Sequence, residues 1–217
     1  MPVFVAAEPR ETQPILIGES AGAGVVVFLI AGGICAGIGS VAFASGAADN
    51  DLIPMTFGLF ALLGFWLMAN GGMRFLASRR LAPPAVTVTV QPLYLGESFR
   101  AHVVQRVRKK VDVNSVTVKL ICCEWVQYQQ GTSTTTETHE VLSVETELPV
   151  SGPIHPPDSI EGDIEFTIPE DAMHSFSAAD NRIDWLLRVH TDVANWPDYK
   201  SDISLNVAAA YAPQEMN

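Results

Sequence analysis

Hydrophobic and polar residues follow two different patterns along the chain, and the first is a pair of long apolar runs. No residue is charged in the 29 positions between Glu19 and Asp49, or in the 22 positions between Asp51 and Arg74. An α-helix needs roughly 20 apolar residues to cross the hydrocarbon core of a bilayer, where only a helix satisfies its own backbone. The pattern therefore predicts a transmembrane helical hairpin within residues 21–80.

The two predicted helices cover about residues 24–47 and 53–76. Only Asp49-Asn50-Asp51 separates them, a connection too short for a domain, so both ends of the hairpin emerge on the same side. Arg79 and Arg80 follow the second helix, whereas the connection carries no Lys or Arg. Because basic residues flank the cytoplasmic ends of membrane helices, we expect a two-helix membrane protein with both termini in the cytoplasm.

The small residues of the first helix indicate where it packs. Gly33 and Gly37 form a pair of small residues four positions apart, and Ala36 with Ser40 continues an adjacent stripe. Such pairs let two helix backbones approach closely. They are candidate helix-packing residues, either against the second helix of the same hairpin or against another membrane protein.

After the hairpin, apolar residues recur at every second position, which is the period of a β-strand with one buried face. A Pro-rich spacer over residues 81–85 ends the helix, and a β domain over residues 86–210 follows, before a C-terminal tail over residues 211–217. The alternation predicts seven strands in that domain, at residues 86–90, 99–103, 116–128, 139–148, 160–168, 183–189 and 203–207. The predicted fold class is therefore membrane α plus an all-β, antiparallel, seven-stranded immunoglobulin-like sandwich.

The N-terminal residues 1–20 are predicted to be a tail. They lack the basic start of a secretory signal. The alternative is that Ile15-Leu16-Ile17 or Pro2-Val3-Phe4-Val5 adds an edge strand to the β domain.

Three motifs of the β domain resemble arrestin-like sandwiches. They are the Leu95-Gly96-Glu97 turn, Phe166-Thr167-Ile168-Pro169, and Ile183-Asp184-Trp185 followed by Trp196-Pro197-Asp198. The resemblance covers roughly residues 86–208 and extends to uncharacterised bacterial membrane proteins that join transmembrane helices to such a domain. It implies an arrestin-like β-sandwich and is nearly silent on function, since a fold does not imply a function.

Charge and cysteine content narrow the classes of partner. The formal net charge is −11, which argues against nucleic acid, because phosphate binding needs a basic surface. Adjacent Cys122 and Cys123 point to opposite faces of a strand and Cys35 lies in the first helix, so no disulfide framework is expected. Unpaired thiols fit a reducing compartment.

Residues that could carry chemistry are sparse. None of the five histidines has ligand spacing with another, and nucleophile elbows, phosphate-binding glycine loops and zincin helices are absent from the sequence. We therefore expect a non-enzymatic protein without a metal or cofactor. Trp125 and Trp185 are assigned to core or inter-sheet packing.

Two surface segments are candidates for binding. The most basic stretch lies between the second and third predicted strands, and the residues we expect to contact anionic lipid, there and after the second helix, are Arg79, Arg80, Arg106, Arg108, Lys109 and Lys110. The alternative is a solvated loop. The polar segment Gln127–His139 is interpreted as an exposed hairpin tip, and such loops often carry binding. The segment Met173–Asn181 is a similar long loop, packed by Phe176.

Three functions remain open on the sequence. The first is a membrane-anchored cytoplasmic binding module, an adaptor or accessory subunit whose sandwich docks an unknown protein. The second is a structural or lipid-organising protein that self-associates into homo-oligomers through Gly33 and Gly37. The third is an enzyme or sensor with a small-molecule site between its sheets, which an acid-lined pocket there would favour.

Overall fold

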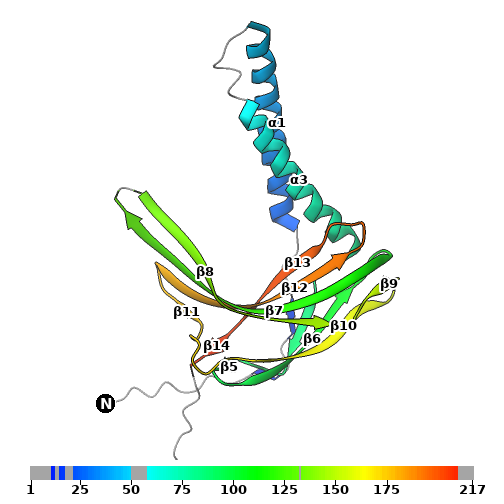
Figure 1. The fold of residues 1–217 in the computed structure, drawn as a ribbon, viewed down its shortest axis with the longest axis vertical. Coiled ribbons are helices and arrows are strands. Elements are labelled where there is room, and N and C mark those ends of the chain that lie inside the picture. The colour runs from blue at the N-terminus through cyan, green and yellow to red at the C-terminus, as the bar shows by residue number, and fades with distance from the viewer. Residues whose placement is uncertain (1–10, 13–14, 18–21, 50–57, 132, 210–217) are drawn as a thin grey trace, which may run out of the picture.

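The computed structural model describes residues 11–12, 15–17, 22–49, 58–131 and 133–209. They form two long helices that rise from one side of a two-layered β domain (Figure 1). The predicted connection around Asn50 and Asp51 and the C-terminal tail over residues 211–217 lie outside the described residues.

The two apolar runs form helices α1 (Gly22–Asp49) and α3 (Gly58–Arg80), which pack against each other. Both are long and apolar enough to cross a membrane. α3 runs past its predicted end at residue 76, because no helix breaker occurs before Pro83-Pro84 and the arginines of its last turn favour the negative end of the helix dipole. Large apolar side chains cover the outside of the pair; Val41 is 72% exposed and Leu59 is 70% exposed.

The contact between the two helices is built on small residues. A Cβ atom at Gly64 of α3 would overlap the backbone of Ala36 and the carbonyl oxygen of Gly32, and one at Gly32 would lie 2.9 Å from the Gly64 carbonyl oxygen. Glycine at these two positions is therefore what lets the helix backbones approach so closely.

The first layer of the β domain is a four-stranded antiparallel sheet with the order β10-β6-β3-β2. Its strands are β10 (Ser159–Thr167), β6 (Ser98–Arg106), β3 (Ala85–Val88) and β2 (Ile15–Ile17). The prediction of a tail over residues 1–20 is wrong at Ile15–Ile17, and the alternative of an added edge strand is confirmed there. The physical reason is that the free edge of β3 offers unpaired backbone groups, and Leu16 packs against the core.

The second layer is a six-stranded sheet, in which β12 (Asn181–Val193) lies between β7 (Val111–Gln130) and β13 (Tyr199–Leu205). β8 (Ser133–Leu148) and the short β9 (Gly152–Ile154) pair with the other edge of β7. Short strand β11 (Phe176–Ser177) extends the sheet beside β12. Two small ladders complete the domain: β1 (Glu11–Thr12) with β4 (Val90–Gln91), and β5 (Leu93–Tyr94) with β14 (Val207–Ala208).

The two layers enclose one apolar core. The alternating inward residues of both sheets meet there, including Val103 and Ile164 from one sheet and Leu120, Trp185 and Leu187 from the other. Every predicted strand overlaps an observed one, but the prediction over residues 86–90 is divided between β3 and β4, and that over residues 203–207 between β13 and β14. The predicted number of strands is therefore too low. Two- and three-residue strands at the edges of the sheets have no readable period, so alternation could not reveal them.

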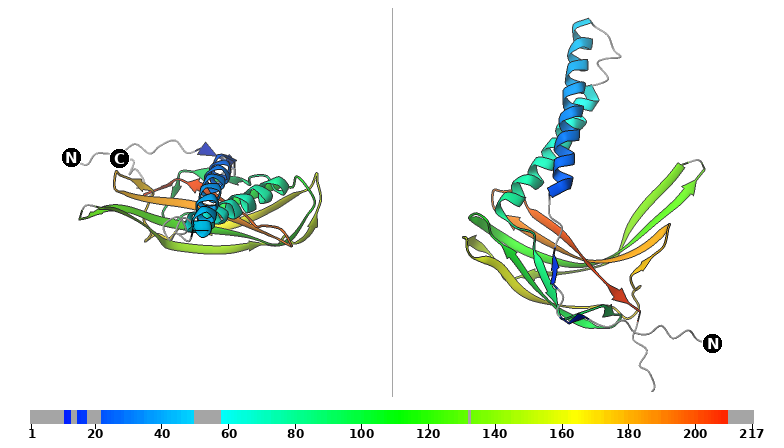
Figure 2. Two further views of the ribbon diagram at one scale, coloured as in Figure 1. Left: turned by 90° about the horizontal axis from the view of Figure 1, so that it is seen from above. Right: turned by 180° about the vertical axis from the view of Figure 1, so that it is seen from behind.

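The hairpin of β7 and β8 extends well beyond the sandwich as a two-stranded ribbon. We call residues 127–136, beyond the last pair of β7 with β12 at Val126, the arm. The arm and the helix pair rise on the same side of the six-stranded sheet (Figures 1 and 2). A register shift at Cys122/Cys123 marks a bulge at the base of this extension, and bulges bend a strand and increase its twist.

Candidate membrane-interface site

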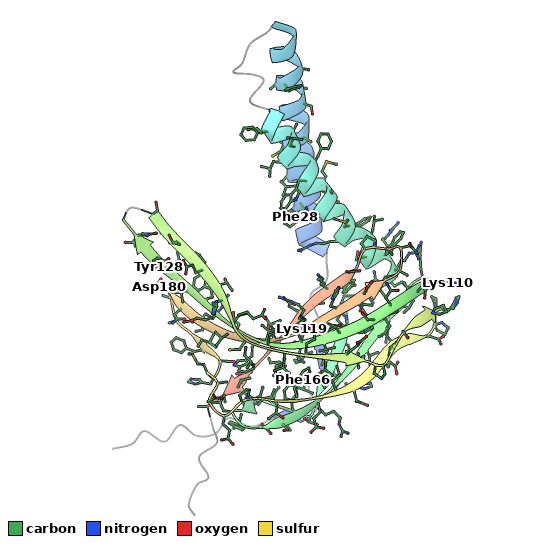
Figure 3. The ribbon with its side chains drawn as sticks, viewed as in Figure 1. Phe28, Lys110, Lys119, Tyr128, Phe166 and Asp180 are labelled. Carbon is green, nitrogen blue, oxygen red and sulfur yellow. The ribbon has the colours of Figure 1, made fainter. Side chains whose placement is uncertain are left out.

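The basic segment between β6 and β7 lies directly at the C-terminal end of α3. Leu81 forms an isolated antiparallel bridge with Val107, and Ala82 donates its backbone N–H to the Arg106 carbonyl oxygen at 2.9 Å. The chain thus pairs with the start of the basic segment as soon as it leaves the helix. Lys110 lies at this end of the sandwich, near the lower end of the helix pair (Figure 3). We call Arg79, Arg80 and residues 106–110 the basic collar.

The collar satisfies the carbonyl groups that a helix end leaves without intrahelical partners. The Arg108 backbone N–H donates to the Arg80 carbonyl oxygen at 2.7 Å, and its guanidinium donates to the Ser78 carbonyl oxygen at 2.9 Å. The Arg80 guanidinium in turn donates to the Lys110 carbonyl oxygen at 2.8 Å. Positive charge at this position also favours the negative end of the helix dipole.

Trp196, in the loop between β12 and β13, closes the collar from the second sheet. The Arg80 guanidinium lies 3.9 Å from the centroid of its ring, and its indole N–H donates to the Leu76 carbonyl oxygen at 3.2 Å. A guanidinium over an indole face is an attractive cation–π arrangement. Two chain segments far apart in sequence, residues 106–110 and the loop that contains Trp196, therefore fix the last turn of α3 to the sandwich.

The collar separates its basic residues into two groups. The guanidinium groups of Arg80 and Arg108 bind backbone carbonyl groups, although Arg108 is exposed and Arg80 is half-buried. The other four, Arg79, Arg106, Lys109 and Lys110, are exposed. Among the described residues, Lys109 and Lys110 form no ion pair. Together with Arg80, Asp112 and Ala194 they line an open hollow of about 400 Å³. Exposed ammonium groups around a hollow can bind an anionic headgroup or a free phosphate as point charges.

A buried polar bridge supports the collar from below, and sequence reasoning did not find it. Gln105 is fully buried; its amide donates to the Ala82 carbonyl oxygen at 3.0 Å, and its oxygen accepts the Thr191 hydroxyl at 2.8 Å. The bridge joins the spacer after α3 to both sheets. Its only sequence signal was a Gln at an inward position of an alternating strand.

The candidate helix-packing residues Gly33 and Gly37 do not lie in the contact between α1 and α3. Gly33 and Gly37 are exposed, and a Cβ atom at either would meet nothing within 4 Å. The alternative in which they pack on the second helix of the same hairpin is therefore wrong. Gly32 and Ala36, which lie on the next face of α1, make that contact instead.

The outer face of the six-stranded sheet, on the side from which the arm and the helices rise, carries cross-strand ion pairs. Lys119 pairs with Glu145 at 2.5 Å, and Arg188 binds Asp202 through two hydrogen bonds of 2.7 and 2.8 Å. Trp125 lies half-buried on this face beside Arg182, so its predicted place in the core is wrong; Trp185, which is 1% exposed, lies in the core as predicted. Exposed pairs of this kind contribute little to stability.

The segment Gln127–His139 is the exposed end of a hairpin, as predicted, and its two strands stay paired almost to the turn. The ladder of β7 and β8 continues to the pair Gln130 and Ser133, and Gly131 turns the chain with a φ of 67°. The expected packing by Phe176 is wrong, since Phe176 is exposed on β11; the Trp185 indole N–H instead binds the Met173 carbonyl oxygen.

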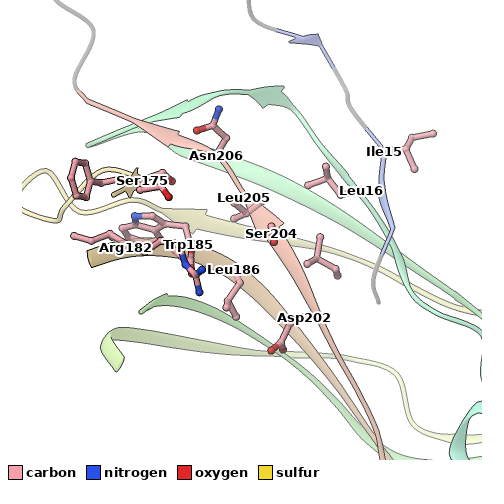
Figure 4. Close-up of a pocket in the computed structure, with 15 residues that line it drawn as sticks. Ile15, Leu16, Ser175, Arg182, Trp185, Leu186, Asp202, Ser204, Leu205 and Asn206 are labelled. Atoms are coloured by element: carbon pink, nitrogen blue, oxygen red, sulfur yellow. The ribbon is translucent and has the colours of Figure 1, made fainter. Parts of the chain in front are cut away.

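A groove of about 1020 Å³ opens between β2 and β13 (Figure 4). Its walls include Leu16, Trp185 and Leu205, and its two acidic residues, Asp184 and Asp202, are each bound by an arginine. Both carboxylates of the groove are therefore engaged in ion pairs.

Thiols and histidines in the described residues form no cluster. Cys35, Cys122 and Cys123 are free, and burial raises the pKa of Cys122 to about 11. His102 and His190 each lie 3.0 Å from one aspartate, and no group of three potential ligands is placed to hold a metal ion within the described ranges.

No protein-family profile and no curated protein sequence matches this chain. The chain is similar in structure to Spo0M, a sporulation control protein from Bacillus subtilis, at 15% sequence identity and a TM-score of 0.44. The match covers 58% of this chain and 49% of Spo0M, so the similarity spans about half of that protein. At this identity and TM-score we draw no conclusion from the similarity about the fold or the function of this chain.

Proposed function

We propose that this protein is a non-catalytic binding module, anchored by two transmembrane helices, whose arrestin-like sandwich docks a protein partner in the cytoplasm. The observation that carries the proposal is the basic collar at the base of an apolar helix pair. A bilayer would cover the exposed apolar side chains of α1 and α3, which no other part of the described chain covers. The collar would then lie at the level of the headgroups.

Charge supports both the lipid contact and the orientation. The exposed cations of the collar would gain about 1 kcal/mol each near an anionic membrane surface. By contrast, the chain from residue 121 onward contains 17 acidic residues and only three basic ones, Arg182, Arg188 and Lys200. The same membrane surface would therefore repel the rest of the domain. Arginines at the end of α3 and free thiols favour the cytoplasmic side.

The rigid attachment of the sandwich supports an adaptor. Arg80, Arg108 and Trp196 fix the domain to the last turn of α3, so its outer sheet face and the arm would keep a constant position relative to the membrane. A domain held in this way can present a binding surface to a neighbouring membrane protein without itself carrying chemistry.

Cross-linking in cells, followed by gentle detergent extraction and mass spectrometry, tests the adaptor. We expect one other protein in stoichiometric amount, and its loss when residues 127–136 are replaced by a two-residue turn. A replacement of the exposed Glu161 of β10 by Gln serves as a control that leaves the arm intact. Recovery of the protein alone, with lipid, would contradict the adaptor.

A second candidate function is self-association into a structural or lipid-organising assembly. The outward position of Gly33 and Gly37, with open space around both, favours it. If it holds, the double substitution Gly33→Leu with Gly37→Leu abolishes oligomers in cross-linking, whereas unchanged oligomers rule this interface out.

A further inference from the structure

The outer edge of β8 is a long strand edge without a partner. Within the described chain β8 pairs with β7 on one side only, over Ser133–Leu148, and no hydrogen bond between backbone groups reaches its other side before Leu148. Such an edge presents a row of free N–H and C=O groups to which another strand can add. Natural proteins usually block it with lysine or proline.

The side chains of β8 do not block this edge against every partner. The strand contains Glu137, Glu140, Glu145 and Glu147 and has no Lys, Arg or Pro. Two of its apolar residues remain exposed, Val141 to 47% and Val144 to 40%. A second copy of β8 would bring like charges opposite each other, which is destabilising, so the edge selects against self-pairing and in favour of a basic strand.

The register of β8 fixes which side of an added strand should be basic. Glu140, Glu145 and Glu147 pair with Cys123, Lys119 and Thr117 of β7 and share the outer sheet face with them. Leu142 and Val144 pair with Cys122 and Leu120 and point the opposite way. A matching strand therefore alternates Lys or Arg on the outer face with Val, Ile or Thr on the other.

The position of β8 indicates where such a strand would come from. The arm carries the start of β8 away from the sandwich on the same side as the helix pair (Figures 1 and 2). Cytoplasmic segments that flank membrane helices are rich in Lys and Arg. β10 is a second acidic edge, but it is shorter and belongs to the sheet farther from the helices.

We propose that the free edge of β8 binds a basic, extended juxtamembrane segment of another membrane protein as an added β-strand. This inference rests on the proposed adaptor function, since it names the surface and the chemistry of the partner. Glu140 and Glu147 contribute most to the charge recognition, because Glu145 is already paired with Lys119 and Glu137 accepts the Tyr128 hydroxyl.

A designed peptide tests the edge directly. The full chain is placed in phosphatidylcholine nanodiscs, which carry no net charge, and titrated with a ten-residue peptide that alternates Lys and Val. Hydrogen–deuterium exchange should show saturable slowing in residues 133–148. The same peptide with N-methylated backbone amides, which keeps the charge but cannot pair as a strand, should have no effect.

Matched variants locate the charge recognition. Glu140→Lys with Glu147→Lys should raise the Kd of the peptide at least tenfold, whereas Glu161→Lys with Glu165→Lys on β10 should leave it within twofold. An absence of saturable slowing at millimolar peptide, slowing confined to other strands, equal effects of the two double variants, or equal binding of the N-methylated peptide would overturn the inference.

The proposed adaptor function does not depend on strand addition at β8. A stoichiometric partner that cross-links in cells but depends on neither Glu140 nor Glu147 would keep the adaptor and overturn the role of the β8 edge. Peptide binding at β8 without any partner in cells would contradict the adaptor instead.

Discussion

At the scale of single residues, the joint between helix and sandwich depends on Gln105. This fully buried amide holds the Ala82 carbonyl group and the Thr191 hydroxyl at once. Replacement by Ala leaves both groups without their partner in the core, and an unsatisfied buried polar group costs about 1–3 kcal/mol.

We therefore predict that Gln105→Ala lowers the free energy of unfolding of the β domain by that amount. Exposed Gln129 on the arm provides the control, since Gln129→Ala should change the value by less than about 0.5 kcal/mol. Denaturant unfolding followed by tryptophan fluorescence measures both. Equal changes in the free energy of unfolding for the two variants would show that the Gln105 bridge does not stabilise the domain.

The same scale shows where sequence reasoning stops. The sequence alone predicts the basic residues of the collar, because their charge follows from residue type. The guanidinium groups of Arg80 and Arg108 bind carbonyl groups, whereas the side chains of Lys109 and Lys110 form no such bond among the described residues. This division depends on contacts between segments far apart in the chain. Trp196 illustrates the same limit, because its partners Leu76 and Arg80 lie on another element.

At the scale of elements, the helix pair depends on the close approach at Gly64. A Cβ atom there would overlap the backbone of Ala36, which has no room to move away, whereas one at Gly33 would meet open space. Overpacking of a close contact typically costs about 1–3 kcal/mol.

Gly64→Val should therefore destabilise the packing of α1 on α3, and Gly33→Val should leave it unchanged. Pairs of cysteines across the helices, placed in a chain without native cysteines, report this through the yield of oxidative cross-linking. The prediction fails if Gly33→Val reduces the yield as much as Gly64→Val does.

Period-two and apolar patterns predicted the main elements because each pattern is local. They placed α1, α3 and every long strand, since burial of one face repeats along the sequence itself. They failed for the arm, where both faces are polar and no alternation marks the ladder from Gln127 to Thr136. They also left open the pairing of Ile15–Ile17, which depends on the free edge of β3.

At the scale of the whole molecule, the arrangement of the helices, the collar and the sandwich supports an anchored module. The helices expose apolar surface, the collar places cations at their base, and the acidic sheets extend away from it. The arm and the β8 edge overlook the same side as the helices, where a partner in the membrane would be reached (Figure 3).

Labelling of single cysteines in intact cells tests this account most directly. In a chain with Cys35, Cys122 and Cys123 replaced by Ala, a membrane-impermeant maleimide should label Asp49→Cys from outside. It should label Gln129→Cys on the arm only after the membrane is made permeable. Labelling of Gln129→Cys in intact cells, or recovery of the protein in the soluble fraction, would contradict the anchored cytoplasmic module.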